Sequence, residues 1–498
     1  MTQETELKLV LDAAHKETAL GLCRQFSKGQ EEDCFSLQNT YYDTADLRLR
    51  QYDIGLRVRR NGTEAEQTVK LAGEVFGGMH SRPEYSLPVT AQGPDITQFD
   101  ESIWPDDFPA FDIQRELTEL FTTNFTRHRW RIPSGDGVIE LVLDEGEVLV
   151  GDKTQPILEI ELEVQGGLVA DAYKLARRFI TRAKARIGTL SKAARGYLLA
   201  EKSILEPFTQ THFVRLNEDD SVGSGLYRAL QYSVQHWQHN DACLREKPSV
   251  RAIAGIADGM RLCRVVLQQL SKLNVDVNDD ITRLEQLLGQ LSWLHRYEGF
   301  AELTAEDGAY HRALEEHPKL YEQVQEQQEH AAQLELMMLL SKRDDYQLTL
   351  LELGELCQRQ PQPADDDGMA QKLKPWATER LREDWQEVMT PFDRDSGLRA
   401  EHYLKLLPAL NGSLQLGYCV GYLFDAAARE KFRAPWLDLA RGIREITALK
   451  MLRETIKDSD ESSVEKLLGW QEMQLESLLF ALESSRRAAL KQEPYWIA

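Results

Sequence analysis

Several features are missing from these 498 residues, and each absence excludes a class of protein. No apolar run reaches the 18 residues that a transmembrane helix needs. The opening MTQETELK carries charges where a signal peptide has its apolar core. The six cysteines are scattered without a CxxC pair, which is typical of free thiols in a reducing compartment. We therefore expect a cytoplasmic protein without a membrane partner.

Basic residues are in deficit as well. The chain has 59 lysines and arginines against 81 aspartates and glutamates, and this net charge of −22 argues against nucleic acid as a partner. There is no GxxxxGK loop and no GxGxxG after a strand, which disfavours P-loop and Rossmann nucleotide sites. Any anion site must therefore be a local pocket in an acidic protein.

The residues up to about 165 alternate between apolar and polar side chains over short segments, which is the pattern of β-strands. The pair Asn61-Gly62 lies between two such segments and predicts a two-residue hairpin. Helical periodicity intervenes near 12–26 and 114–121 and is strongest over 168–185. The expected strands are 3–11, 35–42, 54–60, 64–71, 82–89, 123–132, 137–144 and 155–164.

Charged residues gather on one face of these strands. In LEIELEV the glutamates at 159, 161 and 163 share one side, and the apolar residues at 158, 160 and 162 share the other. An eight-stranded sheet commonly curls and closes, so that one face becomes a lumen. Amphipathic helices such as 168–185 would then cover the apolar face. We predict a barrel with a charged bore.

Such a bore needs residues and ligands of both signs, because like charges repel and desolvated charges are costly. Carboxylates suit a hard divalent cation, and arginines suit the oxygens of a polyanion. The pattern therefore indicates metal-assisted phosphoryl chemistry on a small phosphate compound. The acidic set is Glu4, Glu6, Asp144, Glu159, Glu161 and Glu163. The basic set is Lys8, Arg57, Arg59, Lys70, Arg82, Arg127, Arg129 and Lys192.

The second half of the chain has a different character. Residues 224–356 and 372–490 carry apolar repeats of helical period, with QRQPQPADDDG between them as a linker. We predict an α+β protein with a barrel domain at 1–201, a linker at 202–222 and an all-α domain at 223–498. The all-α domain would form two bundles joined by a linker at about 358–371.

An ordered set of motifs in the first 201 residues resembles the CYTH superfamily. The set comprises the ExExK start, GLRVR, TVK, RPE, LDEGEV, the ELE run and SKAARGY. The resemblance implies a triphosphate tunnel metalloenzyme, with an eight-stranded antiparallel barrel that binds triphosphates inside. It also implies that the helical half is a CHAD domain.

The resemblance assigns roles to the two sets of charged residues. Mg²⁺ or Mn²⁺ would be held by Glu4, Glu6, Glu159 and Glu161, with Asp144 and Glu163 close by. The basic set would bind phosphoryl oxygens, although the resemblance does not single out Arg129, and Glu84 would orient its basic neighbours. We take Glu4, Glu6, Lys8 and Glu161 as the catalytic residues. The general base stays open between water near the Glu159–Glu163 strand and a deprotonated Lys8.

The leading prediction is an inorganic triphosphatase that cleaves tripolyphosphate to pyrophosphate and phosphate. One alternative is an enzyme for thiamine triphosphate or a nucleoside triphosphate, including an adenylate cyclase, with Tyr41, Tyr42 or Tyr85 as the stacking platform. Another is a non-catalytic polyphosphate-sensing module. In the helical half, the i,i+3 arginine pairs at 261/264 and 441/444 give only a weak prediction of polyphosphate contact, since solvated or salt-bridged arginines are commoner. All predicted ligands precede residue 201, so we expect catalysis not to need the helices.

Overall fold

The computed structural model describes residues 2–89, 93–208, 210–308, 310–361, 368–392, 397–459 and 464–497. The described chain forms two compact units. Unit 1 comprises Met1–Pro207, Gln238–Lys247 and Met338–Gln358, and unit 2 comprises Phe208–Trp237, Pro248–Met337 and Arg359–Ala498. Unit 1 therefore takes in two segments that follow residue 201. Part of the linker expected at 358–371, residues 362–367, lies outside the described residues.

A closed antiparallel barrel forms the body of unit 1. The strands follow the order β10-β1-β9-β8-β7-β2-β3-β4-β6-β5, and a further pairing of β1 with β6 closes eight of them into a ring. This confirms the predicted eight-stranded barrel. The strands are β1 (Thr2–Val10), β2 (Asp33–Asp43), β3 (Gly55–Asn61), β4 (Glu64–Lys70), β5 (Glu74–Phe76), β6 (Met79–Pro88), β7 (Thr118–Ser134), β8 (Gly137–Val150), β9 (Lys153–Gln165) and β10 (Arg186–Ile187).

Two details of the strands differ from the prediction. The prediction of a helix over 114–121 is wrong beyond residue 116, because α3 (Ala110–Glu116) ends there and β7 begins at Thr118. Residues 121, 123 and 125 are buried in alternation, and the β-branched Thr122 and Thr123 favour the extended backbone. The hairpin after β3 is confirmed, but its two loop residues are Gly62 and Thr63, between the paired Asn61 and Glu64. Gly62 has φ +60°, which glycine adopts without strain.

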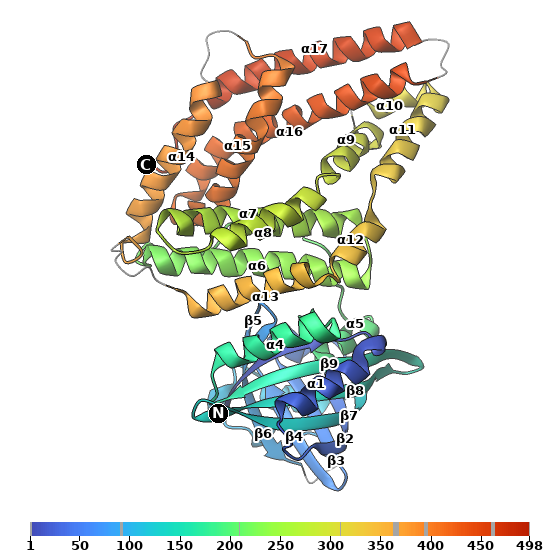
Figure 1. The fold of residues 1–498 in the computed structure, drawn as a ribbon, viewed down its shortest axis with the longest axis vertical. Helices are drawn as coiled ribbons and strands as arrows, with labels where there is room; N and C mark the ends of the chain where they lie inside the picture. Colours follow the sequence, from blue (N-terminus) through green and yellow to red (C-terminus); the bar gives the residue numbers. More distant parts are fainter. Residues whose placement is uncertain are drawn as a thin grey trace. The chain divides into compact units, whose positions relative to one another are not determined.

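The register places apolar residues together on the outer face of the barrel wall. Leu162 lies opposite Leu7 on β1 and opposite Leu141 on β8, and all three are fully buried. The helices α1 (Lys16–Phe26) and α4 (Val169–Ala183) cover this wall and meet at the edge-to-face rings of Phe26 and Phe179. Figure 1 shows both helices beside the barrel strands. The apolar face is thus covered by helices, and the charged face is left for the bore.

The remaining elements are helical. Unit 1 also contains α2 and α5, the ends of α6 and α12 and nearly all of α13, and the other helices build unit 2. None of the helices in the described part of the chain has both the length and the apolar content to cross a bilayer. The bounds are α2 (Arg48–Gln51), α5 (Lys192–Leu199), α6 (Val222–Glu246), α7 (Val250–Lys272), α8 (Asn278–Gln290), α9 (Leu294–Thr304), α10 (His311–Glu315), α11 (Pro318–Ala331), α12 (Leu334–Leu340), α13 (Asp344–Arg359), α14 (Leu373–Phe392), α15 (Ala400–Val420), α16 (Ala426–Lys457) and α17 (Val464–Ala489).

Candidate active site

A cavity of about 1520 Å³ runs through the barrel of unit 1. It is lined by side chains from the inward faces of the strands and from the start of α5. Twelve of the fourteen residues predicted for the site line it: Glu4, Glu6, Lys8, Arg57, Arg59, Lys70, Arg82, Arg127, Arg129, Glu161, Glu163 and Lys192. The other two, Asp144 and Glu159, lie behind the lining and are fully buried.

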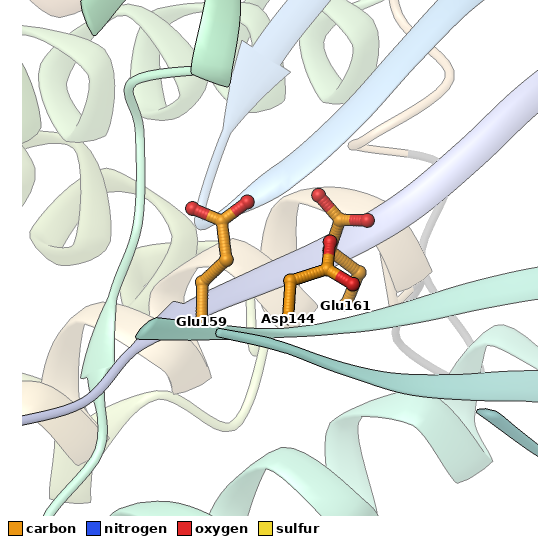
Figure 2. A group of neighbouring side chains, drawn as sticks. All are labelled: Asp144, Glu159 and Glu161. Atoms are coloured by element: carbon orange, nitrogen blue, oxygen red, sulfur yellow. The ribbon is translucent and has the colours of Figure 1, made fainter. Parts of the chain in front are cut away.

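Asp144, Glu159 and Glu161 form a compact acidic group on β8 and β9. One carboxylate oxygen from each lies within 4.8 Å of the others. Figure 2 shows the three side chains rising from these neighbouring strands toward one another. Carboxylates this close together need a shared positive charge, which a divalent metal or cationic side chains can supply.

Two ammonium groups and two guanidinium groups contact this acidic group. Lys8 donates to Glu159 at 3.0 Å and also to Glu161. Lys192 contacts Asp144 at 2.6 Å and Glu161 at 3.0 Å, and it donates to Glu159 as well. Lys192 is the first residue of α5, whose N-cap Ser191 accepts a hydrogen bond from the Ala194 amide at 3.1 Å. The helix start therefore places this ammonium at the cavity.

Arg127 completes the set of cations around the acidic group. Its guanidinium makes a two-pronged contact with Asp144, at 2.8 and 2.7 Å, and a third hydrogen bond to Glu161 at 2.9 Å. Arg195, one helical turn after Lys192, approaches Glu159 at 3.5 Å. Three buried carboxylates are thus balanced by several cations.

The ion pairs fix the charges of the residues in this group. Burial alone would lower the pKa of Lys8, but Glu159 and Glu161 raise it well above the ordinary value. Burial would raise the pKa of Glu161, but Lys192, Lys8 and Arg127 hold it well below the ordinary value. Lys8 therefore stays protonated at neutral pH, which argues against the deprotonated Lys8 that we considered as the general base.

A second group of carboxylates lies in a row across three strands and has a different environment. Glu163 is directly opposite Glu6 on β1 and opposite Glu140 on β8. The cation nearest to Glu6 is Lys8 at 3.8 Å, and Glu163 accepts only from the Gln165 amide at 3.2 Å among the described residues. Burial and neighbouring carboxylates raise the pKa of Glu6 and of Glu163. We call Glu6, Glu140 and Glu163 the acidic row; it has an excess of negative charge.

Arginines with few acidic partners line another part of the cavity. Arg59 donates from Nε to the Asn39 amide oxygen at 3.0 Å, and within the described residues it has no carboxylate partner. Burial, followed by the charges of Arg57 and Arg127, lowers the pKa of Arg59 to about 10. The buried Nε atoms of Arg57 and Arg82 lack a hydrogen-bond acceptor in the described protein. These side chains form an excess of positive charge that an anion would neutralise.

The last three predicted residues are held by ion pairs. Lys70 contacts Glu4 and also Glu84, the latter at 3.0 Å. Burial would raise the pKa of Glu84, but Lys70 and Arg57 bring it to about 2, which fits the predicted orienting role of Glu84. Arg129 lines the cavity but pairs with the exposed Asp33 at 2.8 Å.

Some residues in or beside the cavity are absent from the predicted set. Asn39 is fully buried and joins Arg59 to Thr123, to which its amide donates at 2.9 Å. His80 lines the cavity opposite Glu6, and burial lowers its pKa to about 4. Arg195 could have been found from its i,i+3 spacing to Lys192 on a helix. The alternation along the strands places Asn39 and His80 on the same face as the predicted charged residues. Nothing in the sequence, however, marks an uncharged residue as functional.

The three tyrosines considered as a stacking platform are separated by the fold. Tyr41 lines the cavity but is buried and stacks on Phe121, with ring centres 4.7 Å apart. Tyr42 and Tyr85 belong instead to an apolar cluster on the other face of the sheet. Among the three candidates only Tyr41 could therefore meet a ligand in the bore.

Comparisons with known proteins agree with this arrangement. Residues 2–197, which span the barrel and the helices that cover it, match the family model of the CYTH domain. The inorganic triphosphatase of Haemophilus influenzae is 33% identical over 206 residues, which cover 41% of this chain and 57% of that protein. The chain thus matches just over half the length of this curated relative.

Two solved structures cover different parts of the chain. HpAC1 from Hippeastrum, a proposed adenylyl cyclase described as having a dominant triphosphatase activity, has a TM-score of 0.32 at 18% identity and covers 41% of this chain and 97% of its own. The CHAD domain from Ricinus communis has a TM-score of 0.40 at 14% identity and covers 57% of this chain and 97% of its own.

Proposed function

We propose that unit 1 is a divalent-metal-dependent inorganic triphosphatase that hydrolyses tripolyphosphate to pyrophosphate and phosphate. The observation that carries the proposal is the charge distribution in one cavity. Among the described residues the acidic row has one cation contact, from Lys8 to Glu6 at 3.8 Å, and Arg59 has no carboxylate partner, so the cavity suits a cation and a polyanion together. A receptor for an anion alone would gain little from the surplus carboxylates.

The carboxylates fit a hard divalent cation. Glu6 supplies an oxygen donor, and burial and neighbouring carboxylates raise its pKa. Mg²⁺ or Mn²⁺ would be held from the cavity by Glu4, Glu6 and Glu161, with Glu163 close by. Asp144 and Glu159 stand behind them and hold Lys8 and Lys192. When bound, the cation would neutralise phosphate oxygens and lower the pKa of nearby water.

The basic residues would bind and orient the substrate. Arg57, Arg59 and Arg82 present guanidinium groups suited to phosphate oxygens, and Lys8 and Lys192 remain protonated beside them. The oxygen of a water attacks a terminal phosphorus, and the bond from that phosphorus to the bridging oxygen breaks. Pyrophosphate leaves with the bridging oxygen, and the proton of the water passes to a carboxylate. Glu163 is our candidate for this base, because its pKa is raised and it has no cation partner.

An inorganic substrate is favoured over an organic one. Of the three candidate tyrosines, Tyr42 and Tyr85 face away from the bore, and Tyr41 is stacked on Phe121. None of the three tyrosines therefore offers a thiamine or nucleobase group the exposed aromatic face that such ligands commonly use.

The finer parts of the proposal concern location and the helical half. All six cysteines are free thiols, which supports a cytoplasmic protein. Polyphosphate contact by the helices remains a minor part of the proposal, since Arg261 already pairs with Asp258 at 2.9 Å. We propose no nucleic-acid partner.

Phosphate release from tripolyphosphate, ATP and thiamine triphosphate tests the proposal. We expect turnover of tripolyphosphate with Mg²⁺ or Mn²⁺, none in EDTA, and at least tenfold lower kcat/KM for the organic substrates. The matched variants are Glu161→Gln, which should be inactive, and Glu147→Gln on the exposed side of β8, which should be unchanged. The absence of turnover with all three compounds would instead favour a non-catalytic binding module.

A further inference from the structure

The backbone of Lys8 is held from both sides by two short segments of unit 1. Its amide donates to the carbonyl of Gly78 at 3.0 Å, and its carbonyl accepts from the amide of Gly188 at 2.9 Å. Gly188 also packs against the Lys8 side chain, since a Cβ there would lie 2.9 Å from Lys8 Cγ. The position of the Lys8 ammonium therefore depends on the turn at 77–78 and on the segment at 187–188.

These two segments are held in turn by side chains that come from much later in the sequence. The Gly77 amide donates to the Gln238 side-chain oxygen at 2.9 Å, and the Ile187 amide donates to the Gln347 side-chain oxygen at 2.8 Å. The Ile187 carbonyl accepts from the Arg245 guanidinium at 3.1 Å. Gln238 and Gln347 are 3% and 1% exposed, so water cannot readily replace either acceptor.

The backbone contact between Gly77 and α13 adds a steric restraint. A Cβ on Gly77 would lie 2.4 Å from Gly354 Cα, and a Cβ on Gly354 would lie 2.5 Å from Gly77 Cα. Gly77 also has φ +58°, which other residues adopt only with strain. Neither position tolerates a side chain without a shift of the turn that holds Lys8.

The two helical segments are themselves fixed to each other and to the barrel within unit 1. Asp241 at the end of α6 accepts from Tyr346 on α13 at 2.9 Å and pairs with Arg245 at 2.8 Å. Lys184, which follows α4, pairs with Asp344 at 2.7 Å. The acceptors at 238 and 347 are therefore presented by a braced pair of helices and not by mobile side chains on a loop.

We infer that Gln238 and Gln347 are positioning residues for Lys8. Their buried side-chain amides, which belong to the segments 238–247 and 338–358, fix the backbone on each side of Lys8. They thereby align the Lys8 ammonium with the acidic group in the bore. The consequence for catalysis rests on the proposed function, whereas the hydrogen bonds do not. If Gln238 and Gln347 position Lys8, catalysis depends on helices that follow residue 201, contrary to our expectation from the sequence that it does not need them.

The test uses the full chain and three glutamine-to-methionine variants. Gln347→Met and Gln238→Met keep the side-chain length and remove the acceptor, on opposite sides of Lys8. Gln358→Met is the matched control, an exposed glutamine at the end of α13. Amide hydrogen exchange, measured by mass spectrometry on peptides that cover 5–12 and 185–190, reports how firmly Lys8 and Gly188 are held.

We expect both buried variants to exchange at least tenfold faster in these two peptides, with the control unchanged. Tripolyphosphate affinity in EDTA, from calorimetry, should fall about tenfold in the folded variants, and kcat/KM should fall in parallel. A purely structural role would lower the melting temperature and leave the affinity of the folded protein unchanged. If Gln347→Met does not fold, Gln238→Met decides the question alone.

Wild-type exchange rates in the buried variants would overturn the inference. Faster exchange with unchanged affinity would overturn the positioning role, and equal effects in Gln358→Met would overturn the specificity of the contacts. If the wild-type chain turns over no triphosphate, the proposed function fails, but the exchange and binding measurements still test the role of the two glutamines.

Discussion

Glu161 and Glu163 lie two residues apart on β9 and line the same cavity, yet their neighbours have opposite charge. Glu161 contacts Lys8, Lys192 and Arg127, whereas Glu163 lies opposite Glu6 and Glu140. Neutralising each residue in turn should therefore change stability in opposite directions. The variants are Glu161→Gln and Glu163→Gln, both examined in EDTA so that no divalent cation contributes.

The expected magnitudes follow from the surroundings. Glu161→Gln leaves the buried Lys8 and Lys192 and the half-buried Arg127 short of one negative charge, and removing one partner of a buried ion pair costs about 3–5 kcal/mol. For a unit of this size, that corresponds to a melting temperature lowered by roughly 6–20 °C. Glu163→Gln removes two repulsions between opposed carboxylates, each destabilising by roughly 0.2–1 kcal/mol, so this variant should melt slightly higher.

The pH dependence of the two effects has a definite sign. The folded-state pKa of Glu161 is depressed, so its contribution is present at neutral pH and is lost only as the pH falls through that depressed value. The folded-state pKa of Glu163 is raised, so its ionisation costs stability as the pH rises from the ordinary value of 4.5 through the raised value. The gain from Glu163→Gln should therefore grow as the pH rises through this window and should disappear below 4.5.

Thermal unfolding monitored by hydrogen exchange of β7–β9 peptides measures unit 1 without interference from unit 2. The control is Glu147→Gln, an exposed glutamate on β8, which should melt as the wild type does. Shifts of the same sign for the two variants, or no shift for Glu161→Gln, would refute the assigned charge environments.

Two further predictions concern ligand binding. Arg59→Gln should weaken tripolyphosphate binding in EDTA by about 10–100-fold, as expected for the loss of a charged hydrogen bond. The melting temperature should not fall, because Arg59 lies among cations. Calorimetry measures the affinity and thermal unfolding the melting temperature, and an unchanged affinity would exclude Arg59 from the anion site. Binding of Mn²⁺ should release protons, and it should weaken as the pH falls through the raised pKa of Glu6. Calorimetry in buffers of different ionisation enthalpy measures the number of protons released. Glu6→Gln should reduce that number.

Strand parity predicted which residues face the bore but not how deeply they lie. Glu159 and Glu161 share a face in LEIELEV, as expected, yet only Glu161 lines the cavity, because Lys8 and Lys192 lie over Glu159. The short strands β5 and β10 were not predicted, since two or three residues carry no periodicity. Helical periodicity likewise predicted α13, but it could not show that the side-chain oxygen of Gln347 would accept a hydrogen bond from the Ile187 amide of the barrel sheet.

The sequence by itself determined the composition of the bore. Alternation along each strand sorts side chains to two faces through local backbone geometry alone, so the charged face and the apolar face can be read without knowing any partner. The tertiary structure decided which charges meet. Closure of β1 against β6 and β9 brings Lys8 to Glu159 and Glu161, about 150 residues later in the chain, and leaves Glu163 among other carboxylates. Burial and the facing carboxylates raise the pKa of Glu163, whereas the cations around Glu161 lower its pKa, because a charge responds to the solvent and the charges within a few ångströms in space and not to its neighbours along the chain.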